Sequence, residues 1–250
     1  MGAIGRRVYG LGAVVLGVPA LVLGDFAALG LPVPVAMPGQ QILLYASAGL
    51  LVVAGLATNA PRTPAIGALL LAAFFSFWLL ALHLPIALAK PATWVSWEGV
   101  AETAVSALGG VLAYALAPGV GQARAAASVR IVRPLFGVGL LVFGASEFVY
   151  ARFTASMVPG WLPPSQLFWT YATGAAQIAA GLAIVSGVRA RLAAMLLTAM
   201  YLSFSLIVHL PRLIANPASH GNWAENGVNL ILAGAAWGLA EALRTERTQR

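Results

Sequence analysis

The feature that most constrains this chain is a series of eight apolar segments, each long enough to cross a bilayer as a helix. They cover approximately residues 8–30, 41–59, 64–89, 98–117, 134–153, 167–186, 191–213 and 223–243. A helix needs about 20 mostly apolar residues to cross the hydrocarbon core. Charged residues make up only 8% of the 250 residues, against roughly 25% in soluble domains. The sequence therefore predicts an all-α polytopic membrane protein with eight transmembrane helices.

The second half of the chain repeats the first at a fixed distance. The segment LHLPIALAKPATWVSW aligns with VHLPRLIANPASHGNW, so that His83 faces His209, which lies 126 residues further on. The same offset pairs Pro38 with Pro164, Gln40 with Gln166, Tyr45 with Tyr171 and Gly55 with Gly181. Farther upstream, LVLGDF faces LVFGASEF, which pairs Asp25 with Glu147 after a small insertion. Matches of this kind predict a tandem duplication.

The duplication predicts two domains and their orientation. Residues 1–117 form the first four-helix unit, 118–133 a cytoplasmic linker, and 134–250 the second unit. Because each unit crosses the membrane an even number of times, the two units are parallel repeats. The basic residues on one predicted side are Arg6, Arg7, Arg62, Arg124, Arg130, Arg133, Arg189, Arg191, Arg244, Arg247 and Arg250, and those on the other are Lys90, Arg152 and Arg212. The positive-inside rule then predicts a bacterial-type cytoplasmic membrane protein with both termini in the cytoplasm.

Unusual polar side chains gather near the predicted outward ends of the helices. The candidates for a ligand-binding or proton-relay site are Asp25, Tyr45, His83, Glu98, Glu102, Glu147, Tyr171, His209 and Glu225. A charge inside a bilayer is costly and marks a partner or a function. Carboxylate, imidazole and phenol groups can relay protons or hold the head of a lipid-soluble ligand. In the structural alternative, the same groups join helices, cap their ends and satisfy backbone freed by Pro85 and Pro211.

Several classes of function are excluded or disfavoured. Cysteine is absent, which excludes thiol exchange and cysteine-bound clusters. The basic residues form no stripe with interleaved aromatics, so nucleic acid is not an expected partner. Two symmetric histidines could ligate haem, but nothing fixes their separation, and haem is disfavoured. Nucleophile elbows and phosphate-binding loops are missing, so no catalytic residue and no metal site are assigned.

Small residues are frequent in the predicted helices. Gly234 and Gly238 lie four residues apart in the last one. Small side chains let helix backbones approach closely in lipid. This pair favours tight packing within the bundle over a dedicated dimer motif.

The second half resembles the DoxX-like membrane proteins. The features that carry the resemblance are FGASEF, the VPGWLP loop, GAAQIAAGLAI followed by the basic turn GVRAR, and the long seventh helix. The resemblance covers residues 134–243 well and 11–117 more faintly. It implies a four-helix bundle per unit and, from the family's namesake, quinone-linked oxidation of reduced sulfur compounds. This chain departs from the namesake in carrying two fused units and no cysteine.

These observations lead to three hypotheses about function. In the first, the chain is a quinone-linked redox subunit or accessory protein, with a ligand site in the outward leaflet and a membrane or periplasmic oxidoreductase as partner. Quinone is then the candidate cofactor. In the second, it is a proton-coupled transporter of a small solute. In the third, it is a non-catalytic membrane assembly factor.

Overall fold

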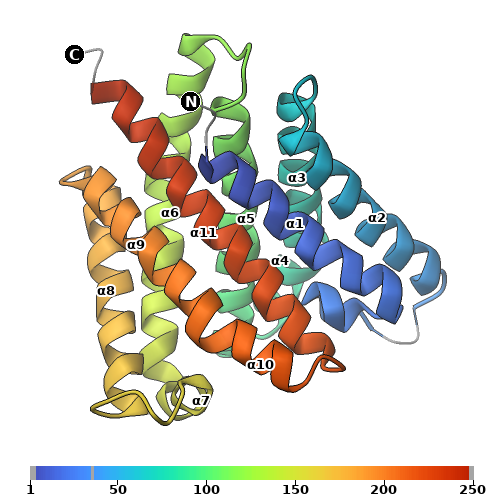
Figure 1. Cartoon of the computed structure of the whole chain (residues 1–250), viewed down its shortest axis with the longest axis vertical. Helices are drawn as coiled ribbons and strands as arrows, with labels where there is room; N and C mark the ends of the chain where they lie inside the picture. Colours follow the sequence, from blue (N-terminus) through green and yellow to red (C-terminus); the bar gives the residue numbers. More distant parts are fainter. Residues whose placement is uncertain (1–3, 35–36, 248–250) are drawn as a thin grey trace.

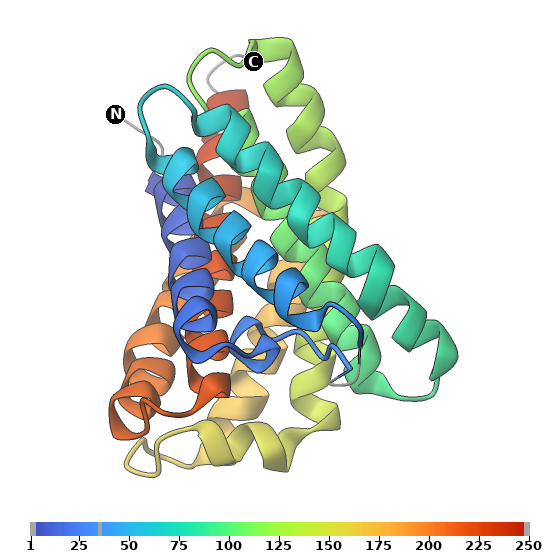
Figure 2. The ribbon, with the colours of Figure 1, turned by 90° about the vertical axis from the view of Figure 1, so that its right-hand side faces the viewer.

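The computed structural model describes residues 4–34 and 37–247, and helices connected by short loops account for that part of the chain without a strand. The elements in chain order are α1 (Ile4–Leu23), η1 (Phe26–Leu29), α2 (Gln40–Asn59), α3 (Pro64–Trp78), η2 (Leu79–His83), α4 (Leu84–Ala89), α5 (Trp94–Ala115), α6 (Gln122–Val149), α7 (Ala151–Met157), α8 (Gln166–Ser186), α9 (Ala190–Phe204), η3 (Ser205–His209), α10 (Leu210–Ala215) and α11 (His220–Arg247). The long helices run side by side along the longest axis of the molecule (Figures 1 and 2).

Six helical spans in the described residues are long and apolar enough to cross a membrane. They are Ile4–Leu23, Gln40–Asn59, Pro64–Ala89, Gln122–Val149, Gln166–Ser186 and Ala190–Ala215. The chain is therefore a multi-pass membrane protein. The remaining long helices, α5 with 22 residues and α11 with 28, carry more polar side chains but lie among the other six (Figure 1).

The helices α5 and α11 lie at the centre because each packs against both halves of the chain. In the first half, α1, α2, α3 and α5 pack in succession, and in the second half α6, α8, α9 and α11 do the same. The last helix of each half also packs against the first helix of the other, α11 on α1 and α5 on α6, and α5 contacts α11. This arrangement keeps the polar side chains of α5 and α11 away from lipid, which explains why a chain can tolerate them.

Each half contains a π-helical turn at the same place. The turn η2 and the turn η3 lie 126 residues apart, and each is followed by a short helix that begins with Leu-Pro. A proline lacks the N–H for a helical bond and its ring clashes with the carbonyl four residues earlier. The wider π turn lets each helix continue past Pro85 or Pro211.

Tryptophans fix the loops that follow these short helices. Trp97 Nε1 donates to the Pro91 carbonyl over 3.0 Å, and Trp223 Nε1 donates to the Pro217 carbonyl over 2.9 Å. Both bonds span six residues and match at the 126-residue offset. The two loops therefore have the same local structure, although their sequences differ at most other positions.

The first helices of the two halves correspond at an offset of 127 residues. Arg6 in α1 donates to the carbonyl of Thr58 in α2, and Arg133 in α6 donates to the carbonyl of Ile184 in α8. The close contacts at glycines show the same two offsets. Gly10 lies against Gly55 and Gly17 against Ala48, while Gly137 lies against Gly181 and Gly144 against Gly174. The acceptor helices keep the 126-residue offset, so the chain between the contacts on the first helix and those on the second is one residue shorter in the second half.

This register corrects the predicted pairing of Asp25 with Glu147. At an offset of 127, Glu147 corresponds to Ala20, inside α1, whereas Asp25 lies after the end of α1 at Leu23. The predicted first segment, 8–30, continues past that end because the apolar residues of η1 resemble a helical run. The structure places Asp25 in the loop and Glu147 within the span of α6.

The predicted linker at residues 118–133 is largely helical. Helix α6 begins at Gln122 and continues without a break through Pro134 to Val149. Only the six residues from 116 to 121 separate α5 from α6. The cluster of arginines in this region resembled a soluble connector, but it forms the first turns of a transmembrane-length helix.

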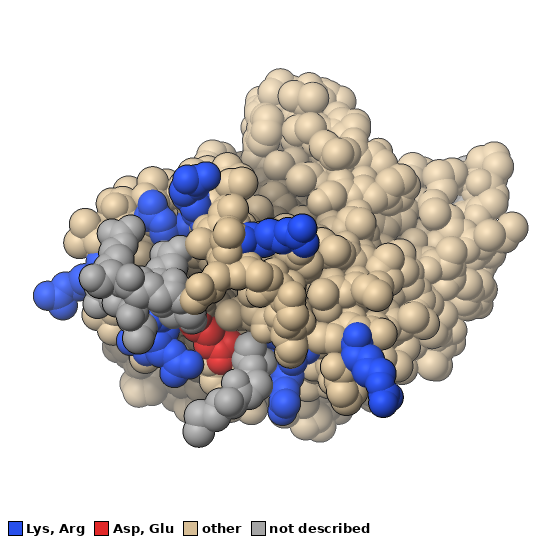
Figure 3. All heavy atoms as spheres, turned by 90° about the horizontal axis from the view of Figure 1, so that it is seen from above, with Lys and Arg blue, Asp and Glu red and all other residues tan. Residues whose placement is uncertain are grey.

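Both ends of the described chain lie at the same end of the bundle, which we call the terminal end; α7 and α10 lie at the opposite end, the loop end (Figure 1). Lysine and arginine side chains surround the helix ends at the terminal end (Figure 3). The predicted concentration of basic residues on one side is thus seen in the described part of the chain, while Arg250 and the side chain of Arg247 lie outside it. That this end faces the cytoplasm stays a prediction.

The glycines of α11 pack inside the chain, as predicted. A Cβ atom on Gly234 would overlap the backbone of Tyr9 in α1, and a Cβ atom on Gly5 would overlap the backbone of Gly238. Tyr9 is fully buried there, and its hydroxyl donates to the Ser106 carbonyl of α5 over 2.7 Å. Small residues therefore join α1, α5 and α11 at the centre.

Candidate functional site

Four carboxyl groups meet near the loop end of the bundle, and we call them the carboxyl cluster: Glu98, Glu102, Glu147 and Glu225. They come from the two central helices, α5 and α11, and from α6. Glu102 interacts electrostatically with both Glu98 and Glu225, and Glu147 interacts with Glu98. The structure thus brings together four of the nine predicted site residues, from both halves of the chain.

The α5–α6 contact positions the first two carboxyls. Glu98 and Glu102 are four residues apart and so share one face of α5. The carboxyl of Glu98 lies beside the Ser146 hydroxyl of α6. Trp94 Nε1, from the first turn of α5, donates to that hydroxyl over 2.8 Å, and the hydroxyl bonds the Val142 carbonyl over 3.0 Å. This connected set fixes the angle at which α5 presents its carboxyls to α6.

Glu147 lies near the end of α6 with one oxygen unsatisfied. Its carboxyl is beside Thr154 of α7, and its Oε2 is buried without a hydrogen-bond partner in the described structure. The neighbouring helix α8 passes close because it has Gly174 there, where a Cβ atom would lie 2.7 Å from the Glu147 Cβ. An unsatisfied buried oxygen is costly, so this position favours a bound proton, water or ligand group.

Tyr201 of α9 completes the cluster, although it was not predicted. Its side chain is only 3% exposed, its hydroxyl interacts with Glu102 and Glu147, and no described residue hydrogen-bonds that hydroxyl. Asn229 Nδ2 holds the same turn of α9 by donating to the Tyr201 carbonyl over 2.7 Å and to Ser205 Oγ over 2.6 Å. Tyr201 and Asn229 could both have been predicted as site residues, because each is a polar side chain in the middle of an apolar span.

Glu225 connects the cluster to the surface of the loop end. Its Oε2 accepts from Arg212 Nη1 of α10 over 2.6 Å and lies 3.6 Å from His209 Nδ1. The second distance allows an ion pair but is too long for a hydrogen bond. Glu225 and Arg212 are each about a third exposed, whereas Glu102 lies deeper and remains only partly accessible. The cluster therefore extends from a half-exposed ion pair into the bundle.

The two equivalent histidines have different surroundings. His83 is buried against Gly99 of α5, where a Cβ atom would lie 2.8 Å from the His83 Nδ1. Gly99 lies 126 residues before Glu225 and so takes the position of that carboxyl in the first half. His209 thus joins the cluster through Glu225, whereas His83 packs over a helix backbone.

Besides His83, three predicted residues lie away from the carboxyl cluster. Tyr45 and Tyr171 are 48% and 44% exposed on α2 and α8, and Tyr171 stacks on Phe148 with ring centroids 5.5 Å apart. Asp25 caps η1 by accepting from the Ala27 backbone N–H over 3.0 Å, and its other oxygen lies 2.7 Å from His220 Nδ1. Asp25 therefore fastens the loop after α1 to the start of α11.

The Asp25 contacts predict an acid-dependent loss of stability. The Ala27 backbone N–H and the His220 ring hold the pKa of the Asp25 carboxyl below its ordinary value. A lowered pKa in the folded state gives stability that is present above the unfolded-state pKa and is lost as the pH falls through the folded-state pKa. We expect the thermal midpoint in detergent to fall on acidification below about pH 4. In Asp25→Asn the midpoint should be lower at neutral pH and change less with acid; an unchanged acid response would contradict the assignment.

Comparison with known proteins gives one partial match. Residues 136–226 match the model of a family described as Domain of unknown function (DUF8561). This segment extends from α6 to the start of α11 and contains Glu147, Tyr201, His209 and Glu225. No curated protein and no solved structure matches the chain. The DoxX-like resemblance stays a prediction.

Proposed function

We propose that the chain is a proton-coupled membrane transporter with eight crossings, in which the carboxyl cluster takes up and releases the coupling protons. The observation that carries the proposal is the position of Glu102. It lies in a central helix, interacts with carboxyls from both its own half and the other half, and remains partly accessible. Carboxyl groups placed together in low dielectric repel one another when ionised. Such a group exchanges protons when its surroundings change.

The arrangement of the halves supports a transport role. The matching π turns, short helices and tryptophan bonds are consistent with a duplicated four-helix unit. In repeat-built transporters, ion and substrate sites lie at the interface between repeats and beside interrupted helices. The carboxyl cluster lies at the interface formed by α5, α6 and α11, and η3 ends at His209 beside it.

The two helices that are less apolar also fit this proposal. Polar residues in a transmembrane helix face the interior of a bundle. Helices α5 and α11 carry Glu98, Glu102 and Glu225, and they are central by their packing. We therefore include them as the fourth and eighth crossings, with both termini on the cytoplasmic side of a bacterial-type membrane.

Reconstitution into liposomes tests the proposal. The pH inside the vesicles is followed with a trapped dye while small organic anions, cations and neutral solutes are added outside, one class at a time. We expect one class to change the internal pH only when the protein is present. If no class moves protons beyond the protein-free rate, proton-coupled transport is wrong.

The quinone-linked role stays a prediction, and one further measurement separates it from transport. Lipids are extracted from the protein purified in mild detergent, and their absorbance is recorded before and after reduction. A quinone retained by the wild type but lost in Glu147→Gln would favour the redox role. An assembly role predicts neither quinone nor proton movement.

A further inference from the structure

A groove of about 420 Å³ lies between α8 and α9, on the terminal side of the carboxyl cluster. The side chains that line it are all small on α8 and mostly larger on α9. They are Ala176, Ala179, Ala180 and Ala183 from α8, and Leu192, Ala193, Leu196, Leu197 and Met200 from α9. Arg189 also lines it, from the turn between the helices. Its size falls in the range of roughly 300–1,000 Å³ that is usual for small-molecule sites.

One residue difference between the halves explains why the groove is open. In the first half, α3 packs against α2 through Gly67, where a Cβ atom would overlap the Thr58 backbone and lie 2.6 Å from the Ala54 carbonyl. In the second half, the position 126 residues later is Ala193, which carries that Cβ atom. Helix α9 therefore cannot approach α8 as closely as α3 approaches α2.

Two residues that line the groove on α8 are also smaller than their counterparts in the first half. Ala176 and Ala179 of the second half correspond to Leu50 and Val53 of the first. Large side chains thus occupy the first half at the positions where the second has only methyl groups. The added space in the second half comes from both the helix separation and the smaller wall.

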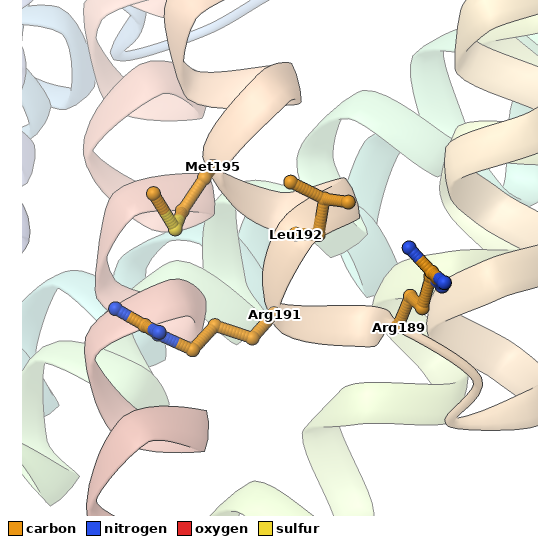
Figure 4. Close-up of a pocket in the computed structure, with 4 residues that line it drawn as sticks. All are labelled: Arg189, Arg191, Leu192 and Met195. Atoms are coloured by element: carbon orange, nitrogen blue, oxygen red, sulfur yellow. The ribbon is translucent and has the colours of Figure 1, made fainter.

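At the two positions that the arginines occupy, the first half carries no charge. Arg189 and Arg191 correspond to Thr63 and Ala65. Arg189 is exposed and adopts a left-handed backbone conformation with φ of 51°, which is strained for a residue with a side chain. Arg191 extends from the other side of the first turn of α9, over an adjoining depression of about 530 Å³ that both arginines line (Figure 4).

We infer that this groove binds an anionic phospholipid, with one acyl chain between α8 and α9 and the phosphate on Arg189. The apolar walls match a hydrocarbon chain, and the outer wall is open to the bundle surface because Leu192, Met195 and Leu196 are exposed. Guanidinium groups bind phosphate with paired hydrogen bonds. The arginine lies at the terminal end, where the head groups of that leaflet would be. The inference depends on membrane insertion and not on the carboxyl cluster.

Native mass spectrometry of the full chain in detergent tests this inference, with phosphatidylglycerol and phosphatidylcholine as probes. We expect the wild type to retain one phosphatidylglycerol in preference to phosphatidylcholine. Arg189→Thr should weaken phosphatidylglycerol binding about fivefold, the contribution of one basic residue near an anionic surface. The double variant Ala176→Leu, Ala179→Val, which restores the residues of the first half, should weaken binding of both lipids.

Arg62→Thr is the matched control because Arg62 lies in the corresponding turn between α2 and α3 and does not line the groove between α8 and α9. It should leave lipid binding unchanged. Equal loss in Arg62→Thr and Arg189→Thr would overturn the inference, as would unaltered binding in Arg189→Thr. Displacement of the lipid by inorganic phosphate would show a free-anion site instead. Thermal unfolding checks that the double variant folds. If the double variant does not fold, the result for Arg189→Thr still tests whether the groove binds the lipid.

Discussion

Replacing Glu102 with glutamine is expected to reduce solute-dependent proton movement in proteoliposomes to the level of protein-free vesicles. Glutamine keeps the size of the side chain and its hydrogen-bonding capacity, but it cannot exchange a proton. Glu102 interacts with Glu98, Glu225 and the Tyr201 hydroxyl, so its loss separates Glu225 from Glu98 and Glu147. The internal pH is measured with the solute class that is active for the wild type.

The same variant should remain folded. Removing one of four neighbouring acidic groups relieves repulsion between like charges, so the thermal midpoint in detergent should not fall. Glu241→Gln is the matched control because Glu241 lies at the terminal end and accepts from the backbone N–H groups of Ile4 and Gly5. Proton movement that persists in Glu102→Gln, or that is lost equally in Glu241→Gln, would show that the cluster does not couple transport.

Replacing Gly234 with leucine is expected to destabilise the whole bundle. A Cβ atom at Gly234 would overlap the Tyr9 backbone nitrogen, and its next nearest neighbours there are the Tyr9 Cα and Cβ atoms. Backbone cannot rotate away as a side chain can, so α1 and α11 must separate. Overpacking of a core costs about 1–3 kcal/mol and more where backbone must move. The thermal midpoint in detergent, followed by circular dichroism, should fall by many degrees or the protein should aggregate.

Gly238→Ala provides the control on the same helix. A Cβ atom there would lie 3.5 Å from Leu116 Cδ1 and 3.7 Å from Leu112 Cβ, which is ordinary contact. Its thermal midpoint should stay close to that of the wild type. If the two variants behave alike, the close packing of α1 on α11 at Gly234 does not hold the bundle together. If Gly234→Leu changes only the oligomeric state, this glycine serves association between copies instead.

The helices themselves could be predicted from the sequence where Pro and Gly end an apolar run. The predicted segment 41–59 is α2 almost residue for residue, and the predicted 64–89 is α3, η2 and α4 together. The predicted bounds were wrong at the end of α1 and at the start of α6. Apolar residues after Leu23 extended the first prediction to residue 30, and arginines before Pro134 made the start of α6 look like a linker.

The candidate site was harder to predict because apolar residues cover both the lipid-facing and the inward-facing sides of these helices. Tyr45 and Tyr171 matched across the repeat, yet both lie on the bundle surface. Glu98 and Glu102 instead meet Glu147 and Glu225, since α5 lies between α3, α6 and α11. In a soluble protein the polar face would have indicated the direction of each helix, but in lipid that signal is weak.

By itself, the sequence determined that the chain lies in a membrane, roughly where its helices begin and end, and that its two halves share motifs at a constant spacing. The tertiary structure alone decided which carboxyls meet, which histidine joins them and where a groove opens. The physical reason is that these outcomes depend on how closely helix backbones approach. One methyl group, present at Ala193 and absent at Gly67, changes that approach without changing the hydropathy that the sequence displays.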